Sequence, residues 1–293
     1  MTISKNPTLI ENKEIVVTSS LVKTVKLRAE YYEWVNDLKQ FTEDLKSQNL
    51  NADLFTFLQA IHSTELFPEL HFEIDSISVL PITTYETWWK SQINDKTRNM
   101  IRRAQKSGVV LREVEFNDQL IKGIKEIYDE SPLRQGKAFK HYGKNLDVLR
   151  NDHISFLDRS QFIGAFYEDK LIGFIKLVHG DGISHLMQII SMIEHRNKAP
   201  TNALISEAVQ ICAQKGVPYL HYGIWSRHGL GDFKRHHAFE RLDLKRFYIP
   251  LSLKGQITLA LSLHRPVKEL LPESWLNFIL DIRRKWNQFK YNR

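Results

Sequence analysis

Acid-base and cationic side chains gather around one short loop in the second half of the chain. Glu194 closes a strand-like apolar run, His185–His195, and the following loop, Arg196–Asn202, is positively charged. Ala203–Gly216 has the spacing of an amphipathic helix that ends at a glycine, and Val217–Gly223 predicts a second short strand. This order of strand, loop, helix and strand suits a binding site.

The start of the predicted helix favours an anionic ligand. A helix N-terminus offers unpaired amide N–H groups and the positive end of the helix dipole, so we expect a phosphate or pyrophosphate to bind there. Neither the glycine pattern of a dinucleotide fold nor that of a nucleoside triphosphate loop is present, which argues against both classes. The expected ligand-binding residues of the loop are Arg196, Asn197, Lys198, Thr201 and Asn202.

Glu194 is the candidate general base. Because it follows the apolar run, its carboxylate is expected to be partly desolvated and able to accept a proton, directly or through water. A salt bridge to Arg196 or Lys198 is the alternative. Metal chemistry is not expected, since His236 and His237 lack a partner at metal-ligand spacing. The single cysteine, Cys212, lies on the apolar face of the predicted helix and is expected to be a buried structural thiol.

The composition describes a globular chain. Of the 293 residues, 42% are hydrophobic and 26% are charged, which gives room for one large domain or two small ones. No apolar run reaches the ~20 residues needed to cross a bilayer, and the N-terminal segment lacks the apolar core of a signal peptide. A cytoplasmic location is the resulting expectation.

The formal net charge of +7 is concentrated in two basic clusters, one in Lys96–Lys106 and one in Arg283–Arg293. Such patches suit anionic partners, namely a phosphorylated donor, a nucleotide-linked acceptor, tRNA or a membrane surface. Solvated helix faces are the alternative. The tail also has an apolar stripe at helical spacing. We expect this stripe either to pack on the domain or to lie on the inner face of the membrane as a peripheral contact. The stripe consists of Trp275, Phe278, Ile279, Ile282, Trp286 and Phe289.

The alternation of strand-like and helical runs predicts the domain organisation. In the N-terminal part, Ile15–Leu27 and Phe72–Ile82 are strand-like, whereas Asp37–Gln48 and Ala52–His62 are interpreted as helical. Thr84 is expected to cap a long helical segment. The predicted domains are 1–83, an abbreviated α/β unit; 84–108, a basic connecting helix; 109–251, an α/β domain; and 252–293, a helical tail.

Three stretches together resemble the GNAT acyltransferase superfamily, and within it the branch of the Fem-type peptidoglycan aminoacyltransferases. Asp95–Val114 is similar to the basic helix and first strand that open the second GNAT domain of those enzymes. Leu171–Gly223 resembles the central strands and donor-binding turn, and Leu230–Leu251 the final helix and strand. The resemblance covers Tyr85–Leu251. It implies an α/β fold with a GNAT-like mixed sheet flanked by helices, preceded by an abbreviated α/β N-terminal unit.

The resemblance also implies acyl transfer, which needs a neutral nucleophile, a stabilised oxyanion and a proton for the leaving group. Glu194 would take the proton of the nucleophile. Tyr222 would face the same cleft and protonate a leaving thiolate or alkoxide. Lys234, in a Phe-Lys pair that those enzymes place beside the reacting carbonyl, would stabilise the oxyanion or contact a donor phosphate. Packing of Tyr222 and solvation of Lys234 are the alternatives.

The loop Ser131–Asn145 lies where the superfamily borders its acceptor. Its cations and glycines favour a mobile, anion-binding segment, so we expect an anionic acceptor such as a nucleotide sugar, a phosphorylated glycan or a carboxylate. A solvated loop is the alternative. The expected substrate-binding residues are Arg134, Gln135, Lys137, His141, Tyr142 and Lys144, together with Trp225.

Three functions fit these patterns. The first is transfer of an acyl group from an acyl-CoA-type thioester to an amine or hydroxyl of a small or glycan-linked acceptor, without a tightly bound cofactor. The second is a Fem-type reaction with aminoacyl-tRNA as donor, in which the Lys96–Lys106 cluster holds the RNA backbone. The third is a non-catalytic module that binds nucleic acid or membrane. The loop Arg196–Asn202 departs from acetyl-CoA-using members, because it has no glycine and contains Pro200, which lacks an N–H.

Overall fold

The computed structural model describes residues 8–18, 21–48, 50–65, 67–226 and 229–264. Contacts among these residues divide them into two compact units, one made of residues up to 77 together with 241–264, the other of residues 78–240. Residues 241–264 therefore group with the N-terminal residues, although the sequence suggested a boundary after residue 251. The predicted domain ranges stay a prediction. The apolar stripe and the basic cluster of the tail lie outside the described residues.

The first unit is a twisted sheet with one helix packed on its aromatic core. The helix, α1 (Leu38–Ser47), begins at Asp37, whose side chain accepts the N–H of Gln40. Phe41 of this helix stacks on Phe55, with ring centroids 5.3 Å apart. The sheet has the strand order β1 (Thr8–Ile10), β2 (Lys13–Thr18), β3 (Thr24–Leu27), β4 (Leu54–Leu58), β13 (Glu240–Pro250) and β5 (His71–Pro81), and a further helix, α8 (Leu253–Ala260), follows β13.

The prediction that Ala52–His62 is helical is wrong. Leu54–Leu58 form β4, which pairs in parallel with β3 and antiparallel with β13, and all five of its residues are buried. A short, continuously apolar run carries no period that separates helix from strand, so the partners on either side decided its conformation. The other strand and helix assignments for this unit are confirmed in type.

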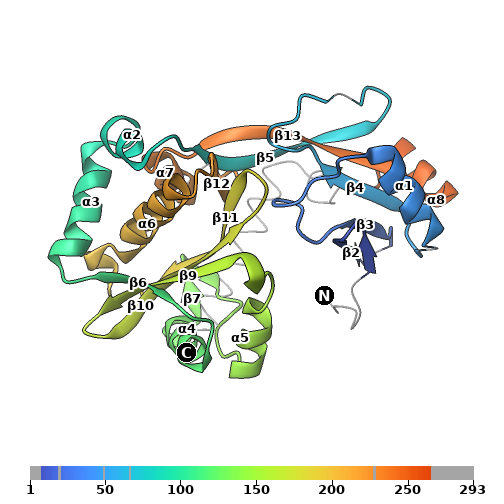
Figure 1. The fold of residues 1–293 in the computed structure, drawn as a ribbon. Coiled ribbons are helices and arrows are strands. Elements are labelled where there is room, and N and C mark those ends of the chain that lie inside the picture. The colour runs from blue at the N-terminus through green and yellow to red at the C-terminus, as the bar shows by residue number, and fades with distance from the viewer. Residues whose placement is uncertain (1–7, 19–20, 49, 66, 227–228, 265–293) are drawn as a thin grey trace. The chain divides into compact units, whose positions relative to one another are not determined.

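The second unit holds a mixed sheet between two layers of helices. The strands β6 (Val110–Val114), β9 (Ser160–Tyr167), β10 (Lys170–His179) and β11 (Ile183–Ser191) are antiparallel, and β12 (Tyr219–Ile224) joins β11 in parallel. Figure 1 shows α3 (Asp95–Lys106) and α6 (Pro200–Gln214) on one face, and α4 (Asp118–Asp129) and α5 (Leu146–His153) on the other. The predicted α/β fold with a mixed sheet flanked by helices is confirmed.

Local signals explain how several of these elements begin and end. Thr84 accepts the N–H of Thr87 and caps α2 (Tyr85–Thr87), which continues as a π-helical turn, Trp88–Gln92. Glu168 and Asp169, with φ of 48° and 58°, form a two-residue turn between β9 and β10. Among the described residues no helix is long and apolar enough to cross a membrane.

Two short elements complete the second unit beside the end of β11. β7 (Leu133–Arg134) and β8 (Lys137–Ala138) form a hairpin whose turn residues, Gln135 and Gly136, have φ of 53° and 71°. The helix α7 (Leu230–His236) precedes β13. The segment Ser131–Asn145, expected as a loop, thus contains a small hairpin that fixes the position of Arg134 and Gln135.

Candidate functional site

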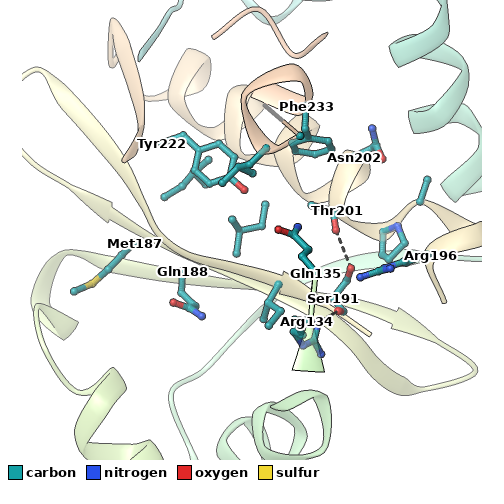
Figure 2. A pocket seen from close by; sticks show the side chains of 17 residues that line it. Arg134, Gln135, Met187, Gln188, Ser191, Arg196, Thr201, Asn202, Tyr222 and Phe233 are labelled. Atoms are coloured by element: carbon teal, nitrogen blue, oxygen red, sulfur yellow. Dashed lines mark hydrogen bonds between the residues drawn. The ribbon is translucent and has the colours of Figure 1, made fainter. Parts of the chain in front are cut away.

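A cavity of about 670 Å³ lies in the second unit between β11 and β12 (Figure 2). The β7–β8 turn forms one wall, β11 and Tyr222 of β12 two others, and the starts of α6 and α7 close it. The lining residues are Arg134, Gln135, Leu186, Met187, Gln188, Ile189, Ile190, Ser191, Arg196, Ala199, Pro200, Thr201, Asn202, Tyr222, Gly229, Leu230 and Phe233.

The cavity exists because the two parallel strands separate. Their register joins Ile183–His185 to Tyr219–His221, whereas β11 continues to Ser191 and there lines the cavity. The pairing of β10 with β11 shifts at this point: Lys176 lies opposite Gln188 and Leu177 opposite Leu186, so Met187 is the extra residue of a β-bulge. A bulge bends its strand, which carries the end of β11 away from β12.

The start of α6 forms the cationic end of the cavity. Ala199 has a left-handed backbone with φ of 55°, and Pro200 is the first helical residue, so the helix starts three residues before the predicted Ala203. The N–H groups of Asn202 and Ala203 both donate to the carbonyl of Ala199. The helix start consequently presents the side chains of Thr201, Asn202 and nearby Arg196 rather than a row of free amides.

Glu130 at the end of α4 holds the segment between β11 and this loop. Its carboxylate accepts the backbone N–H groups of Ile193, at 2.6 Å, and Glu194, at 2.8 Å, and also pairs with Arg134 at 3.2 Å. Arg134 in turn donates to the carbonyls of Ser191, at 2.8 Å, and Ile127, at 2.7 Å. Burial lowers the pKa of Arg134 below its ordinary value. The Arg134 guanidinium therefore fixes the C-terminal end of β11 and also lines the cavity.

Tyr222 and Lys234 meet at the opposite end. Lys234 is 2% exposed and donates to the carbonyl of Ile224, at 2.8 Å, and to the hydroxyl of Ser78, at 3.2 Å. Its Nζ lies 4.7 Å from the centre of the Tyr222 ring, which itself faces the cavity (Figure 2). Burial lowers the pKa of Lys234 to about 8, and burial raises the pKa of Tyr222. Near pH 7 both groups hold their protons.

Two histidines lie on the strands just before they separate. The Nδ1 atoms of His185 and His221 share a hydrogen bond, and the ring centroids are 4.3 Å apart. Burial, with a smaller contribution from Lys234, lowers the pKa of His185 to about 3, and burial also lowers that of His221. Both imidazoles are neutral, so this part of the sheet adds no positive charge near Lys234.

The structure brings six of the predicted site residues to the cavity, and Lys234 contacts it through Tyr222. The six are Arg134, Gln135, Arg196, Thr201, Asn202 and Tyr222. The other predicted residues do not line it. They are Glu194, Asn197, Lys198, Lys137, His141, Tyr142, Lys144 and Trp225. Their predicted roles stay predictions.

Several of the residues outside the cavity have structural contacts of their own. Lys198 lies 3.9 Å from the Tyr167 ring centre, and Lys144 pairs with Asp152 at 2.5 Å. His141 packs against Tyr128, and burial lowers its pKa to about 4.

Glu194 is exposed, so the desolvation expected from the preceding apolar run is not present. Trp225 lies under the guanidinium of Arg235, which is 5.7 Å from its ring centre.

The basic helix α3 does not present all of its cations to solvent. Arg98 donates to the carbonyls of Trp89, at 2.7 Å, and Ile93, at 2.6 Å, and so closes the π-helical turn before α3. The exposed cations of the helix are Lys96, Arg102, Arg103 and Lys106. An anionic partner would meet these side chains rather than Arg98.

Sequence reasoning missed part of the lining. Gln188 and Ser191 of β11 face the cavity, and the Ser191 hydroxyl shares a 2.8 Å hydrogen bond with that of Thr201. Phe233 of α7, next to Lys234 in sequence, also lines the cavity. Polar residues inside an otherwise apolar strand were the available signal, because a fully buried strand would not place Gln and Ser there.

Comparisons with known proteins agree with this fold. No family model and no curated protein matches the chain. Among solved structures, the C-terminal DUF2156 domain of an Agrobacterium fabrum protein described as a lysylphosphatidylglycerol synthetase is similar at 12% identity, with TM-score 0.57 and coverage of 85% of this chain and 83% of that one. L-PGS from Bacillus licheniformis matches at 12% identity, TM-score 0.54 and 84% of both chains.

FemX matches at 9% identity, TM-score 0.55 and coverage of 84% of this chain and 85% of that one. At these identities the comparisons establish the fold and not the activity. The chain therefore shares its fold with FemX and with these two proteins, in agreement with the resemblance seen in its sequence.

Proposed function

We propose that the protein is an acyltransferase that moves an acyl group from an acyl-CoA-type thioester to an amine or hydroxyl of a small or glycan-linked, anionic acceptor. One observation carries the proposal. The parallel strands separate over a cavity of about 670 Å³ that has an arginine with hydroxyl and amide side chains at one end, and a tyrosine backed by a buried lysine at the other. Both a donor terminus and an acceptor can enter a space of this size.

The donor phosphates are assigned to the cationic end. Arg196 supplies the charge, and Thr201 and Asn202 supply hydrogen-bonding side chains at the start of α6, where the helix dipole favours an anion. Arg134 and Gln135 on the β7–β8 turn are assigned to the acceptor. The guanidinium of Arg134 is the reason to expect an anionic group there, because charge-assisted hydrogen bonds are about twice as strong as neutral ones.

The chemical step is assigned to the end of the cavity beside β12. As the nucleophile attacks the acyl carbonyl, negative charge develops on the carbonyl oxygen, and the Lys234 ammonium stabilises it. Tyr222 keeps its proton at neutral pH and can deliver it to the leaving thiolate. Glu194, exposed near the end of β11, would accept the proton of the nucleophile through water.

Aminoacyl-tRNA is the second candidate donor, and one observation favours it. The loop before α6 pairs amides of its own, since Lys198 donates to the carbonyl of His195 and Ala199 to that of Arg196, and Pro200 has no N–H. A loop built in this way offers fewer backbone donors to the pyrophosphate of coenzyme A. A tRNA donor would instead place its backbone phosphates on exposed cations such as Arg103 and Lys106.

Calorimetric titration with acetyl-CoA, longer acyl-CoAs and charged tRNA distinguishes the two donors. We expect acyl-CoA to bind and to support turnover. Arg196→Ala should raise the donor KM by about 10- to 100-fold, the loss of one charge-assisted contact. Lys198→Ala is the matched control, because this lysine has the same charge and lies in the same loop but packs on Tyr167 outside the cavity lining.

A second pair of variants tests the alternative. Arg103→Ala with Lys106→Ala should leave acyl-CoA binding unchanged and should weaken tRNA binding if tRNA is the donor. Binding of charged tRNA without any binding of acyl-CoA would replace the first candidate by the second. Absence of binding and turnover with both donors would refute the assignment of the cavity to acyl transfer.

A further inference from the structure

Three potential metal ligands converge in the first unit, which the proposed reaction does not use. His71 and Glu73 occupy alternate positions of β5 and therefore point to the same face of the strand. His264 reaches them from the turn that follows α8. One nitrogen of each histidine and one carboxylate oxygen of Glu73 all lie within 4.8 Å of one another.

The ring of His264 is the most informative member of this group. Its side chain is only 3% exposed, and its Nε2 lies 3.1 Å from a Glu73 carboxylate oxygen. Its Nδ1 is buried and has no hydrogen-bond partner among the described residues. Buried polar atoms are nearly always satisfied, so an unpaired imidazole nitrogen beside a second histidine and a carboxylate favours a metal ion as its partner.

Tyr248 of β13 orients the carboxylate from behind. Its hydroxyl donates to the second oxygen of Glu73 at 3.1 Å, and its ring centre lies 4.7 Å from that of His264. The His71 and His264 rings are 5.0 Å apart and nearly perpendicular, at 88°. Metal-binding carboxylates and imidazoles are usually held by such outer hydrogen bonds and ring contacts.

We propose that His71, Glu73 and His264 form a zinc site. Two imidazole nitrogens and one carboxylate oxygen are a donor set that Zn²⁺ accepts, with water in the fourth position. Bonds of about 2.0–2.2 Å in a tetrahedron place ligand atoms about 3.4 Å apart, so the present cluster closes by roughly 1 Å through side-chain rotation. The ion would join β5 to the segment after α8 within the first unit.

The experiment uses the full-length chain without a histidine tag, stripped of metal by a chelator and then dialysed. Calorimetric titration with ZnCl₂ should show one ion bound per chain, and Co²⁺ should give the visible absorption of a tetrahedral site. His264→Asn and Glu73→Gln should abolish both signals. Tyr248→Phe, which keeps the packed ring, should weaken Zn²⁺ binding by roughly 10-fold or more.

The matched control is His236→Asn, because His236 is an exposed histidine in the other unit. This variant should bind Zn²⁺ like the parent chain. The proposal is overturned if the folded parent chain binds no Zn²⁺, if binding persists in both Glu73→Gln and His264→Asn, or if it is lost in His236→Asn. Circular dichroism of each variant establishes that the chain is folded, and Tyr248→Phe decides the matter if a ligand variant unfolds.

Discussion

Replacement of Lys234 by methionine tests the assignment of the chemical step. Methionine has nearly the length of the lysine stem and fits an apolar environment, but it removes the ammonium that lies 4.7 Å from the Tyr222 ring centre. Loss of one preorganised group that stabilises an oxyanion typically lowers kcat by about 10²- to 10³-fold, or roughly 3–4 kcal/mol. We expect a loss of this size with the true donor and acceptor, and little change in donor KM.

The pH dependence of the parent enzyme gives a second measurement of the same group. Lys234 has a pKa of about 8 in the folded chain, lowered by burial. Its ammonium is therefore present below this pH and is lost as the pH rises through it. The kcat should fall on the alkaline side near pH 8, and Lys234→Met should abolish this decline together with most of the turnover.

Lys176→Met is the matched control. Lys176 is also buried, and burial lowers its pKa to about 8 as well, but its ammonium donates to the carbonyls of His153 and Ser155. The Lys234 ammonium instead lies beside the ring of Tyr222, which lines the cavity. Both variants leave buried carbonyl groups without a donor, so both should lower the melting temperature. If Lys234→Met retains near-parent turnover, or if Lys176→Met loses as much, the lysine acts through stability and not through the oxyanion.

Three further predictions concern positioning and stability. Glu130→Gln should lower the melting temperature and raise the acceptor KM, because a neutral amide accepts the N–H groups of Ile193 and Glu194 less strongly than a carboxylate does. Glu126 is exposed and lies one turn earlier on α4, so Glu126→Gln should change neither quantity. Gly231→Ala should be destabilising, since an added Cβ would lie 1.9 Å from the Ser226 carbonyl oxygen, and normal melting behaviour would contradict this geometry. The free energy of unfolding, measured by chemical denaturation, should fall as the pH is lowered from about 6.5 to 4. The unfolded chain binds protons in this range, whereas buried imidazoles of lowered pKa do not, and each such histidine should cost roughly 3 kcal/mol of stability. A free energy of unfolding that does not change with pH would refute their burial. These imidazoles, each with a pKa of about 4, are His141, His153, His179 and His237.

Much of the second unit follows from local sequence. The turn at Glu168 and Asp169, the cap at Thr84 and the order of strand, basic loop, helix and strand all depend on residues within a few positions of one another. Short-range preferences of this kind survive folding when the tertiary packing agrees with them. They were sufficient to predict the fold and to place Arg196, Thr201 and Asn202 at the start of a helix.

The cationic residues show where local reasoning ends. Arg196 and Lys198 have the same charge and lie two positions apart, yet Arg196 lines the cavity and Lys198 packs on Tyr167. Lys144 likewise forms a salt bridge with Asp152. Each cation contacts a partner that folding brings near it, and Lys198 and Tyr167, for example, are 31 positions apart in sequence. No local pattern encodes that competition.

The sequence by itself determined the fold class, the order of strand, basic loop, helix and strand in the second unit, and the residue types available to the candidate site. Only the tertiary structure decided that Leu54–Leu58 is a strand, that α6 begins at Pro200, and that a bulge at Met187 opens the cavity. The physical reason is the same in each case. Strand pairing, and the register shift that produces a bulge, are set by hydrogen bonds to neighbouring strands, whose positions are fixed by the packing of the whole sheet rather than by adjacent residues.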